Sequence, residues 1–136
     1  MRAASWTPRV LVVEDDRTNR ECLGLLLMLW GYEVRLACDG PSALEASQSF
    51  CPQVVLLDIA LPGLDGWEVA RRLRRQEVLG PLLLVALTGY ARDEDGRRAR
   101  EAGFDVHLVK PVDPARLKAL LAKEPVGRES TCLLPL

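Results

Sequence analysis

The chain has 136 residues, a length that fits one domain with a single sizeable hydrophobic core. Hydrophobic residues make up 49% of it, which excludes a largely disordered protein, and the 18 Lys and Arg are balanced by 19 Asp and Glu, which excludes a bulk positive field for nucleic acid. No apolar run is long enough to span a bilayer and no export signal is evident, so we expect a cytoplasmic protein. The four cysteines have no CxxC spacing, which favours reduced thiols over a zinc site.

The first part of the chain alternates between strand and helix patterns. The continuous apolar run in Arg9 to Glu14 predicts a buried strand. Leucines at spacings of three and four then predict a helix from about Thr18 to Trp30, with a capping box that begins at Thr18 and an end at Gly31. The segment from Glu33 to Cys38 predicts a second strand, half exposed.

The same alternation continues to the end of the periodic region. Asp39-Gly40-Pro41 predicts the start of a helix that runs through Ala46, and Asp113 as N-cap with Pro114 predicts the start of the last helix. Between them we expect strands at 54–58, 82–88 and 106–109 and helices at about 65–75 and 92–101. Five strands alternating with five helices predict an α/β fold with a parallel sheet covered on both faces.

Polar residues stand where the predicted strands end. Glu14-Asp15-Asp16 follows the first strand, Asp58 ends the third, Thr88 ends the fourth and Lys110 follows the fifth. The carboxyl ends of parallel strands lie on one edge of the sheet, so these residues can meet. Clustered carboxylates need a cation, and Mg²⁺ suits oxygen ligands shared with a phosphate. A carboxylate, Mg²⁺, a lysine and a hydroxyl are together what phosphoryl transfer to an aspartate requires.

Four segments, VLVVEDD, VVLLDIALPGLDG, ALTGYA and LVKP, occur in this order at these strand ends. Over residues 9–122 the chain resembles the receiver domain of two-component response regulators. The resemblance implies a flavodoxin-like, doubly wound sheet of order 2-1-3-4-5. It also implies residue roles: Asp58 as phosphoacceptor, Asp15 as a direct Mg²⁺ ligand, Glu14 as a ligand through water, the Ala60 carbonyl as a further ligand, and Thr88 and Lys110 as partners of the phosphoryl oxygens.

Some residues have a plainer interpretation beside the functional one. Asp16 is better explained as a helix-start residue than as a ligand. Lys110-Pro111 is a candidate cis peptide. The family usually has Tyr or Phe where this chain has His107, so His107 is either a partly exposed surface residue or a switch residue that moves with Thr88.

The resemblance implies a signalling domain and not an enzyme. It would take phosphate from a phosphohistidine on a sensor histidine kinase or histidine phosphotransfer protein and signal through helix 92–101, strand 106–109 and the last helix. A pseudo-receiver that only docks partners would typically lack the acidic pair or the lysine. A phosphohydrolase of the haloacid dehalogenase type would need a second Asp at the position of Ala60. Both alternatives are therefore weaker.

The domain boundaries follow from where periodicity begins and ends. We expect an N-terminal extension at 1–8, the receiver domain at 9–122, and a tail or linker stub at 123–136. The receiver is either a single-domain regulator or part of a larger protein. The stretch HLVKPVDP is similar to receivers joined to hybrid histidine kinases, which favours tethering in such a kinase.

Overall fold

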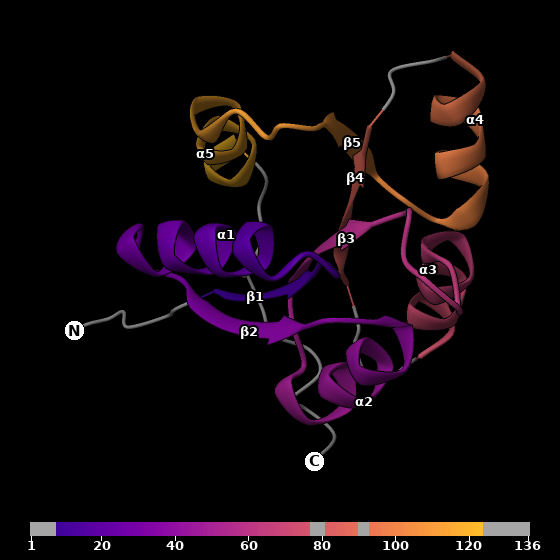
Figure 1. Cartoon of the computed structure of the whole chain (residues 1–136), viewed down its shortest axis with the longest axis horizontal. Coiled ribbons are helices and arrows are strands. Elements are labelled where there is room, and N and C mark those ends of the chain that lie inside the picture. Colours follow the sequence, from indigo (N-terminus) through magenta and orange to yellow (C-terminus); the bar gives the residue numbers. More distant parts are fainter. Residues whose placement is uncertain (1–7, 77–80, 90–92, 124–136) are drawn as a thin grey trace.

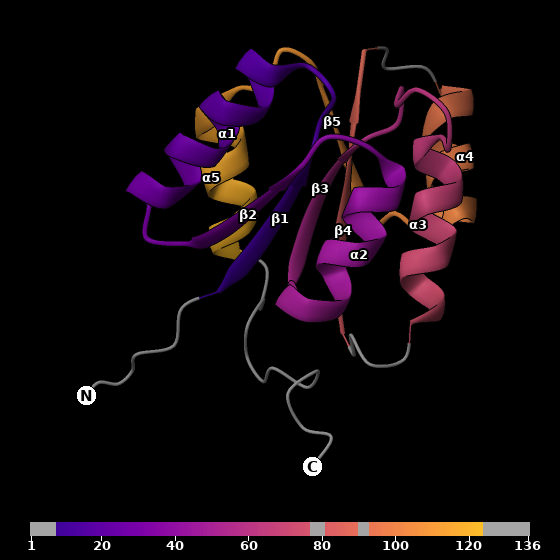
Figure 2. The same ribbon diagram turned by 60° about the horizontal axis from the view of Figure 1, so that its bottom comes forward.

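The computed structural model describes residues 8–76, 81–89 and 93–123. Within these ranges the chain forms a parallel sheet of five strands in the order β2-β1-β3-β4-β5. Helices α1 and α5 cover one face of the sheet, and α2, α3 and α4 cover the other (Figures 1 and 2). This is the flavodoxin-like, doubly wound architecture predicted from the sequence.

The elements lie close to their expected positions. The strands are β1 (Arg9–Val13), β2 (Glu33–Ala37), β3 (Val54–Asp58), β4 (Leu83–Thr88) and β5 (Val106–Val109). The helices are α1 (Arg17–Leu29), α2 (Gly40–Phe50), α3 (Gly66–Arg75), α4 (Asp93–Ala102) and α5 (Pro114–Lys123). Helix α2 continues beyond Ala46, and Arg92, the expected first residue of α4, lies outside the described residues, as do the predicted extension up to Thr7 and the predicted tail from residue 124.

The start of α1 corrects one prediction. Asp16, not Thr18, is the N-cap: its backbone is extended, and its carboxylate accepts a hydrogen bond from Asn19 N at 2.8 Å. The capping box at Thr18 is therefore wrong, because Asp16 has already satisfied a free amide of the first turn and Thr18 lies inside the helix. The plainer interpretation of Asp16, as a helix-start residue, is confirmed.

The end of α1 is a Schellman motif. Tyr32 N donates to Leu27 O at 3.1 Å, and Gly31 N donates to Met28 O at 3.0 Å. Gly31 has φ of 97°, a left-handed conformation in which a side chain would be strained, so glycine ends the helix as predicted.

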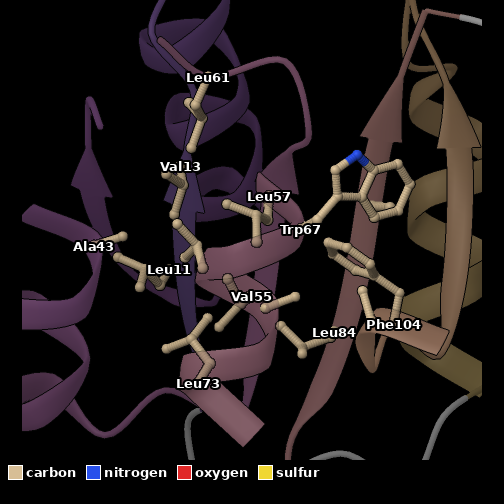
Figure 3. Close-up of a cluster of buried hydrophobic side chains, with 14 of the residues drawn as sticks. Leu11, Val13, Ala43, Val55, Leu57, Leu61, Trp67, Leu73, Leu84 and Phe104 are labelled. Carbon is tan, nitrogen blue, oxygen red and sulfur yellow. The ribbon is translucent and has the colours of Figure 1, made fainter. Parts of the chain in front are cut away.

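Two hydrophobic clusters hold the helices to the sheet. Alternate strand residues point to opposite faces, so Leu11, Val55 and Leu84 pack under α2, α3 and α4, while their neighbours pack under α1 and α5. Figure 3 shows the first cluster, where the rings of Trp67 and Phe104 meet edge to face with centroids 6.0 Å apart. None of the helices in the described ranges combines the length and apolarity needed to cross a lipid bilayer.

Candidate functional site

The candidate site lies at the carboxyl edge of the sheet, and strand alternation explains how it is assembled. In β1 the residues Val10 and Val12 face α1 and α5, so Glu14 follows on the same side. In β3 the residues Val54 and Leu56 face the same helices, which places Asp58 on that side too. Because β1 and β3 are paired in register, with Val13 beside Leu57, their next residues arrive side by side.

Lys110 connects the two buried carboxylates. Its Nζ lies 2.7 Å from Asp58 Oδ2 and 2.9 Å from Glu14 Oε1, forming an ion pair with each. The Asp58 and Glu14 side chains are almost fully buried, whereas the lysine remains partly accessible. The peptide bond from Lys110 to Pro111 is cis, as predicted.

The second oxygen of Asp58 is held by the following loop. Asp58 Oδ1 accepts a hydrogen bond from Ala60 N at 2.8 Å, so both carboxylate oxygens have a fixed partner. The loop folds back on the strand end: a Cβ added to Gly66 would lie 2.4 Å from Ile59 Cα and 2.7 Å from Asp58 O. Gly66 therefore fixes the loop against the end of β3, because only glycine permits this close approach.

The loop between β1 and α1 is held by two groups. Glu14 Oε2 accepts a hydrogen bond from Asp16 N at 3.1 Å. The Arg20 guanidinium donates to Glu14 O at 2.9 Å and to Asp15 O at 3.2 Å, closing the acidic loop against α1. Arg20 was not predicted as part of the site; the signal in the sequence is a cation one helical turn after Asp16, on the face that returns to the loop.

Burial and charge act differently on the two ends of this network. Partial burial tends to lower the pKa of the Lys110 ammonium, but the hydrogen bonds and charges of Asp58 and Glu14 outweigh burial and raise that pKa above its usual value. Burial also raises the pKa of the Glu14 carboxyl, more than the hydrogen bonds from Lys110 and Asp16 N lower it, and the charge of Asp58 raises it further. Lys110 therefore stays positively charged. The charged form of Glu14 is destabilised by burial, and an additional cation would stabilise it.

Glu14, Asp15 and Asp58 form a possible metal site. They each offer one carboxylate oxygen, and these atoms all lie within 4.8 Å of one another. Three carboxylates exceed the charge of Lys110, and hard oxygen donors of this kind suit Mg²⁺. The donor set therefore fits the predicted metal by its chemistry as well as its spacing.

Thr88 and His107 lie on the strands nearest to Lys110. Thr88 ends β4, is buried, and accepts a hydrogen bond from Lys110 N at its backbone oxygen, at 2.7 Å. His107 lies on β5, opposite Ala86, and its side chain is exposed. The structure thus holds the end of β4 at Thr88 against Lys110 and leaves His107 at the surface.

A groove opens next to this site. It has a volume of about 420 Å³ and runs between α1 and the start of α5. Glu14 and Lys110 are among the residues that line it, Asn19 and Cys22 line it from α1, and residues 111, 112 and 114 line it from the start of α5. Two of the charged residues of the site therefore line a cavity that reaches both α1 and α5.

Comparison with known proteins decides the family. The family model for the response regulator receiver domain matches residues 10–122. The chain belongs to this family. It is therefore a receiver domain of two-component signalling, a signalling module and not a conventional enzyme. The transcriptional regulatory protein AfsQ1 of Streptomyces coelicolor is 39% identical over 128 residues, which cover 91% of this chain and 55% of AfsQ1.

Solved receiver structures are similar in fold and sequence. The chemotaxis protein CheY4 of Vibrio cholerae superposes with a TM-score of 0.81 at 29% identity, covering 85% of this chain and 97% of CheY4. The receiver domain of sensor histidine kinase PA1611 from Pseudomonas aeruginosa, which has a magnesium ion coordinated in its active-site cleft, gives a TM-score of 0.76 at 32% identity, covering 85% of this receiver and 94% of that chain.

The length of the relatives limits what transfers to this receiver. It spans about half the length of several transcriptional regulators that it matches, including AfsQ1 and the Bacillus subtilis regulator PhoP. Activities that those regulators owe to regions outside the matched part do not transfer to this receiver.

Proposed function

We propose that Asp58 accepts a phosphoryl group from a phosphohistidine. The observation that carries this proposal is the position of Lys110, whose ammonium bridges Asp58 and Glu14 while three carboxylates lie together. A structural ion pair would be balanced; here the excess negative charge suits a site that takes up Mg²⁺ and a phosphoryl group.

The residues of the receiver have distinct parts in this transfer. A carboxylate oxygen of Asp58 attacks phosphorus, and the P–O bond forms as the P–N bond to the donor imidazole breaks, with the bonding pair leaving on nitrogen. Lys110 and the Thr88 hydroxyl would then hold phosphoryl oxygens by charge-assisted hydrogen bonds. Ala60 N keeps the Asp58 carboxylate oriented, and Gly66 keeps the loop that carries Ala60 in place.

The metal site of this receiver would be formed by Asp15 and Asp58 directly, by Glu14 through water, and by the Ala60 carbonyl. When bound there, Mg²⁺ would neutralise charge on the transferring oxygens. Arg20 would act as a positioning residue, since it holds the backbone on both sides of the Glu14–Asp15 peptide.

The signal would leave through α4, β5 and α5. Phosphorylation adds about two negative charges at Asp58, which draw Thr88 inward. We expect this movement to bias His107 and α4 towards a second arrangement, since in the described part of α4 the buried side chains are small, Ala99 and Ala102.

The phosphodonor would be a sensor histidine kinase or a histidine phosphotransfer protein in the cytoplasm. It would approach through the groove between α1 and the start of α5, which leads to Lys110. Tethering in a hybrid kinase is one form this could take, and the likeness to the PA1611 receiver supports it. We do not expect the receiver itself to bind nucleic acid or a membrane.

The test is a phosphorylation assay in which a second aspartate variant serves as the control. Incubation with acetyl phosphate and Mg²⁺ should add one phosphoryl mass, measured by intact-protein mass spectrometry. Asp58→Asn should abolish this gain. Asp65→Asn, a change of the same kind in the loop after Asp58, should retain it, because Asp65 caps α3 and takes no part in the site. Full labelling of the Asp58→Asn protein would refute the assignment, whereas no labelling of the unaltered protein would favour a docking-only pseudo-receiver.

A further inference from the structure

The outer surface of α1 is unexpectedly apolar. Leu25 and Met28 are each 60% exposed, and Leu29 is 74% exposed. The outer surface of α3 shows the usual alternative, with Glu68 and several arginines facing solvent. A contiguous patch of exposed apolar side chains is a common mark of an interaction surface.

These side chains are continuous with the edge strand of the sheet. Leu25 and Leu29 lie one helical turn apart on α1, and Met28 lies one turn after Gly24. Gly24 packs closely on Leu36 of β2, since a Cβ added to it would lie 2.9 Å from Leu36 Cδ2, and Leu36 is itself 39% exposed. We call Leu25, Met28, Leu29 and Leu36 the α1–β2 patch.

The size of the patch selects the kind of partner. A stable dimer of independent proteins buries about 20–30 residues on each side. Four apolar side chains fall well short of that, but they match a short apolar segment that is already tethered nearby, because tethering lowers the entropic cost of association.

The chain carries such a segment after α5. Residues 124–131 read EPVGREST and are mostly polar, and residues 132–136 read CLLPL. These residues lie outside the described part of the chain. Their three leucines, Leu133, Leu134 and Leu136, correspond in kind to the exposed leucines of the patch.

The helix that carries this segment lies next to α1. Lys118 Nζ lies 5.6 Å from the centroid of the Trp30 ring, and Trp30 is the C-cap of α1, so the middle of α5 lies beside the end of α1. Figure 2 shows α5 and α1 on the same face of the sheet. The 13 residues after Lys123 can reach about 40 Å when extended, whereas a helix with its side chains is roughly 10 Å wide.

We propose that residues 132–136 dock on the α1–β2 patch of the same molecule. Leu133, Leu134 and Leu136 cover Leu25, Met28 and Leu29, and the polar residues 124–131 form the connection from α5. The docked segment shields an apolar surface that lies one turn from Cys22 and therefore borders the groove beside Lys110. The proposal does not depend on phosphorylation of Asp58.

Paramagnetic broadening tests this contact in the full chain. A nitroxide is attached at Ser130→Cys after Cys22, Cys38 and Cys132 are each changed to Ser; the fourth cysteine, Cys51, is buried and is retained. Amide signals of residues 25, 28, 29 and 36 should lose most of their intensity, and those of residues 71–75 on α3 should keep theirs. Leu134→Asp should restore the lost signals, whereas Val126→Asp, the same change in the connecting residues, should not.

A mixed sample separates the possible partners of the patch. Spin-labelled chain without ¹⁵N is combined with ¹⁵N chain without nitroxide, and no broadening is expected there. Broadening of residues 25–29 in the mixed sample as well would replace the proposal with contact between two copies. Equal broadening on α1 and α3 would overturn it.

Dye binding gives a second measurement without the cysteine changes. Leu134→Asp should increase the fluorescence of the apolar dye ANS by exposing the patch, and adding Leu29→Ser should reverse much of the increase. An unchanged signal with Leu134→Asp would contradict docking.

Discussion

Both edges of the sheet hold charged side chains, but they use them differently. At the amino edge, Arg9 Nε donates to the carbonyls of Phe50 and Cys51, and Arg74 donates to the carbonyls of Leu82 and Gly103 and to Asp105. These charges join backbone segments. At the carboxyl edge, Glu14, Asp15 and Asp58 lie close to one another, and Lys110 pairs with Glu14 and Asp58. At the amino edge the charged side chains bind mainly backbone carbonyls and so stabilise the fold. At the carboxyl edge the charged side chains lie next to other charged side chains, an arrangement that suits a ligand-binding site.

The difference has a physical basis. A guanidinium that meets carbonyl oxygens replaces the water it loses and needs no further ion. Clustered carboxylates repel one another and raise the cost of burial, as the raised pKa of Glu14 indicates. The clustered carboxylates therefore contribute little to the stability of the fold. We expect substitutions at the carboxyl edge to affect phosphorylation and substitutions at the amino edge to affect folding.

The largest effect is expected for Lys110→Ala. Loss of the ammonium removes the partner of Asp58 and Glu14, and phosphorylation by acetyl phosphate should slow roughly 100-fold or more. Time-resolved intact mass measures this rate. Lys118→Ala is the control, since Lys118 lies over Trp30, away from the site. An unchanged phosphorylation rate with Lys110→Ala would show that the ion pairs of Lys110 serve only the fold, as those of the amino-edge arginines do.

Gly66→Ala should affect both folding and phosphorylation. The added Cβ would force the loop away from Ile59 and the Asp58 carbonyl, at a cost of about 2–3 kcal/mol in the free energy of unfolding. Urea denaturation measures the loss. Gly89→Ala is the matched control, because a Cβ there meets nothing within 4 Å. Equal stability of the two variants would mean that the close approach is not tight in solution.

Arg74→Ala should affect folding alone. It leaves the carbonyls of Leu82 and Gly103 and the Asp105 carboxylate without their guanidinium, and the free energy of unfolding should fall by about 2 kcal/mol. The adjacent, exposed Arg75→Ala should change it by less than about 0.5 kcal/mol. Slower phosphorylation of the folded Arg74→Ala protein would contradict the expectation that the amino edge affects folding alone.

The smallest effect is expected for Arg20→Ala, which sharpens the comparison. Arg20 resembles the amino-edge arginines because it donates to backbone oxygens, but those oxygens belong to Glu14 and Asp15. Mg²⁺ affinity should fall roughly tenfold while the free energy of unfolding changes little. Arg20→Lys should restore part of the affinity, and Arg17→Ala should leave it unchanged. Isothermal titration with Mg²⁺ measures each variant, and a loss of stability without a loss of affinity would make Arg20 purely structural.

Local features of the fold were predictable from sequence. The strands are continuous apolar runs, and Asp39 and Asp65 cap α2 and α3 as short acceptor side chains do. Two acceptors competed for the start of α1, and the choice of Asp16 over Thr18 depended on where the chain left β1. Such a choice lies within the usual one- or two-residue uncertainty of helix ends.

The sequence by itself determined which residues could form the site, because polar side chains at the ends of apolar strands must share one edge of a parallel sheet. Only the tertiary structure decided how they meet. Lys110 bridges Glu14 and Asp58 because β1, β3 and the end of β5 arrive in register on one side. The carbonyl partners of Arg20 and Arg74, and the close approach at Gly66, leave no periodic signal, since backbone atoms are the same in every residue and their positions depend on the folded chain.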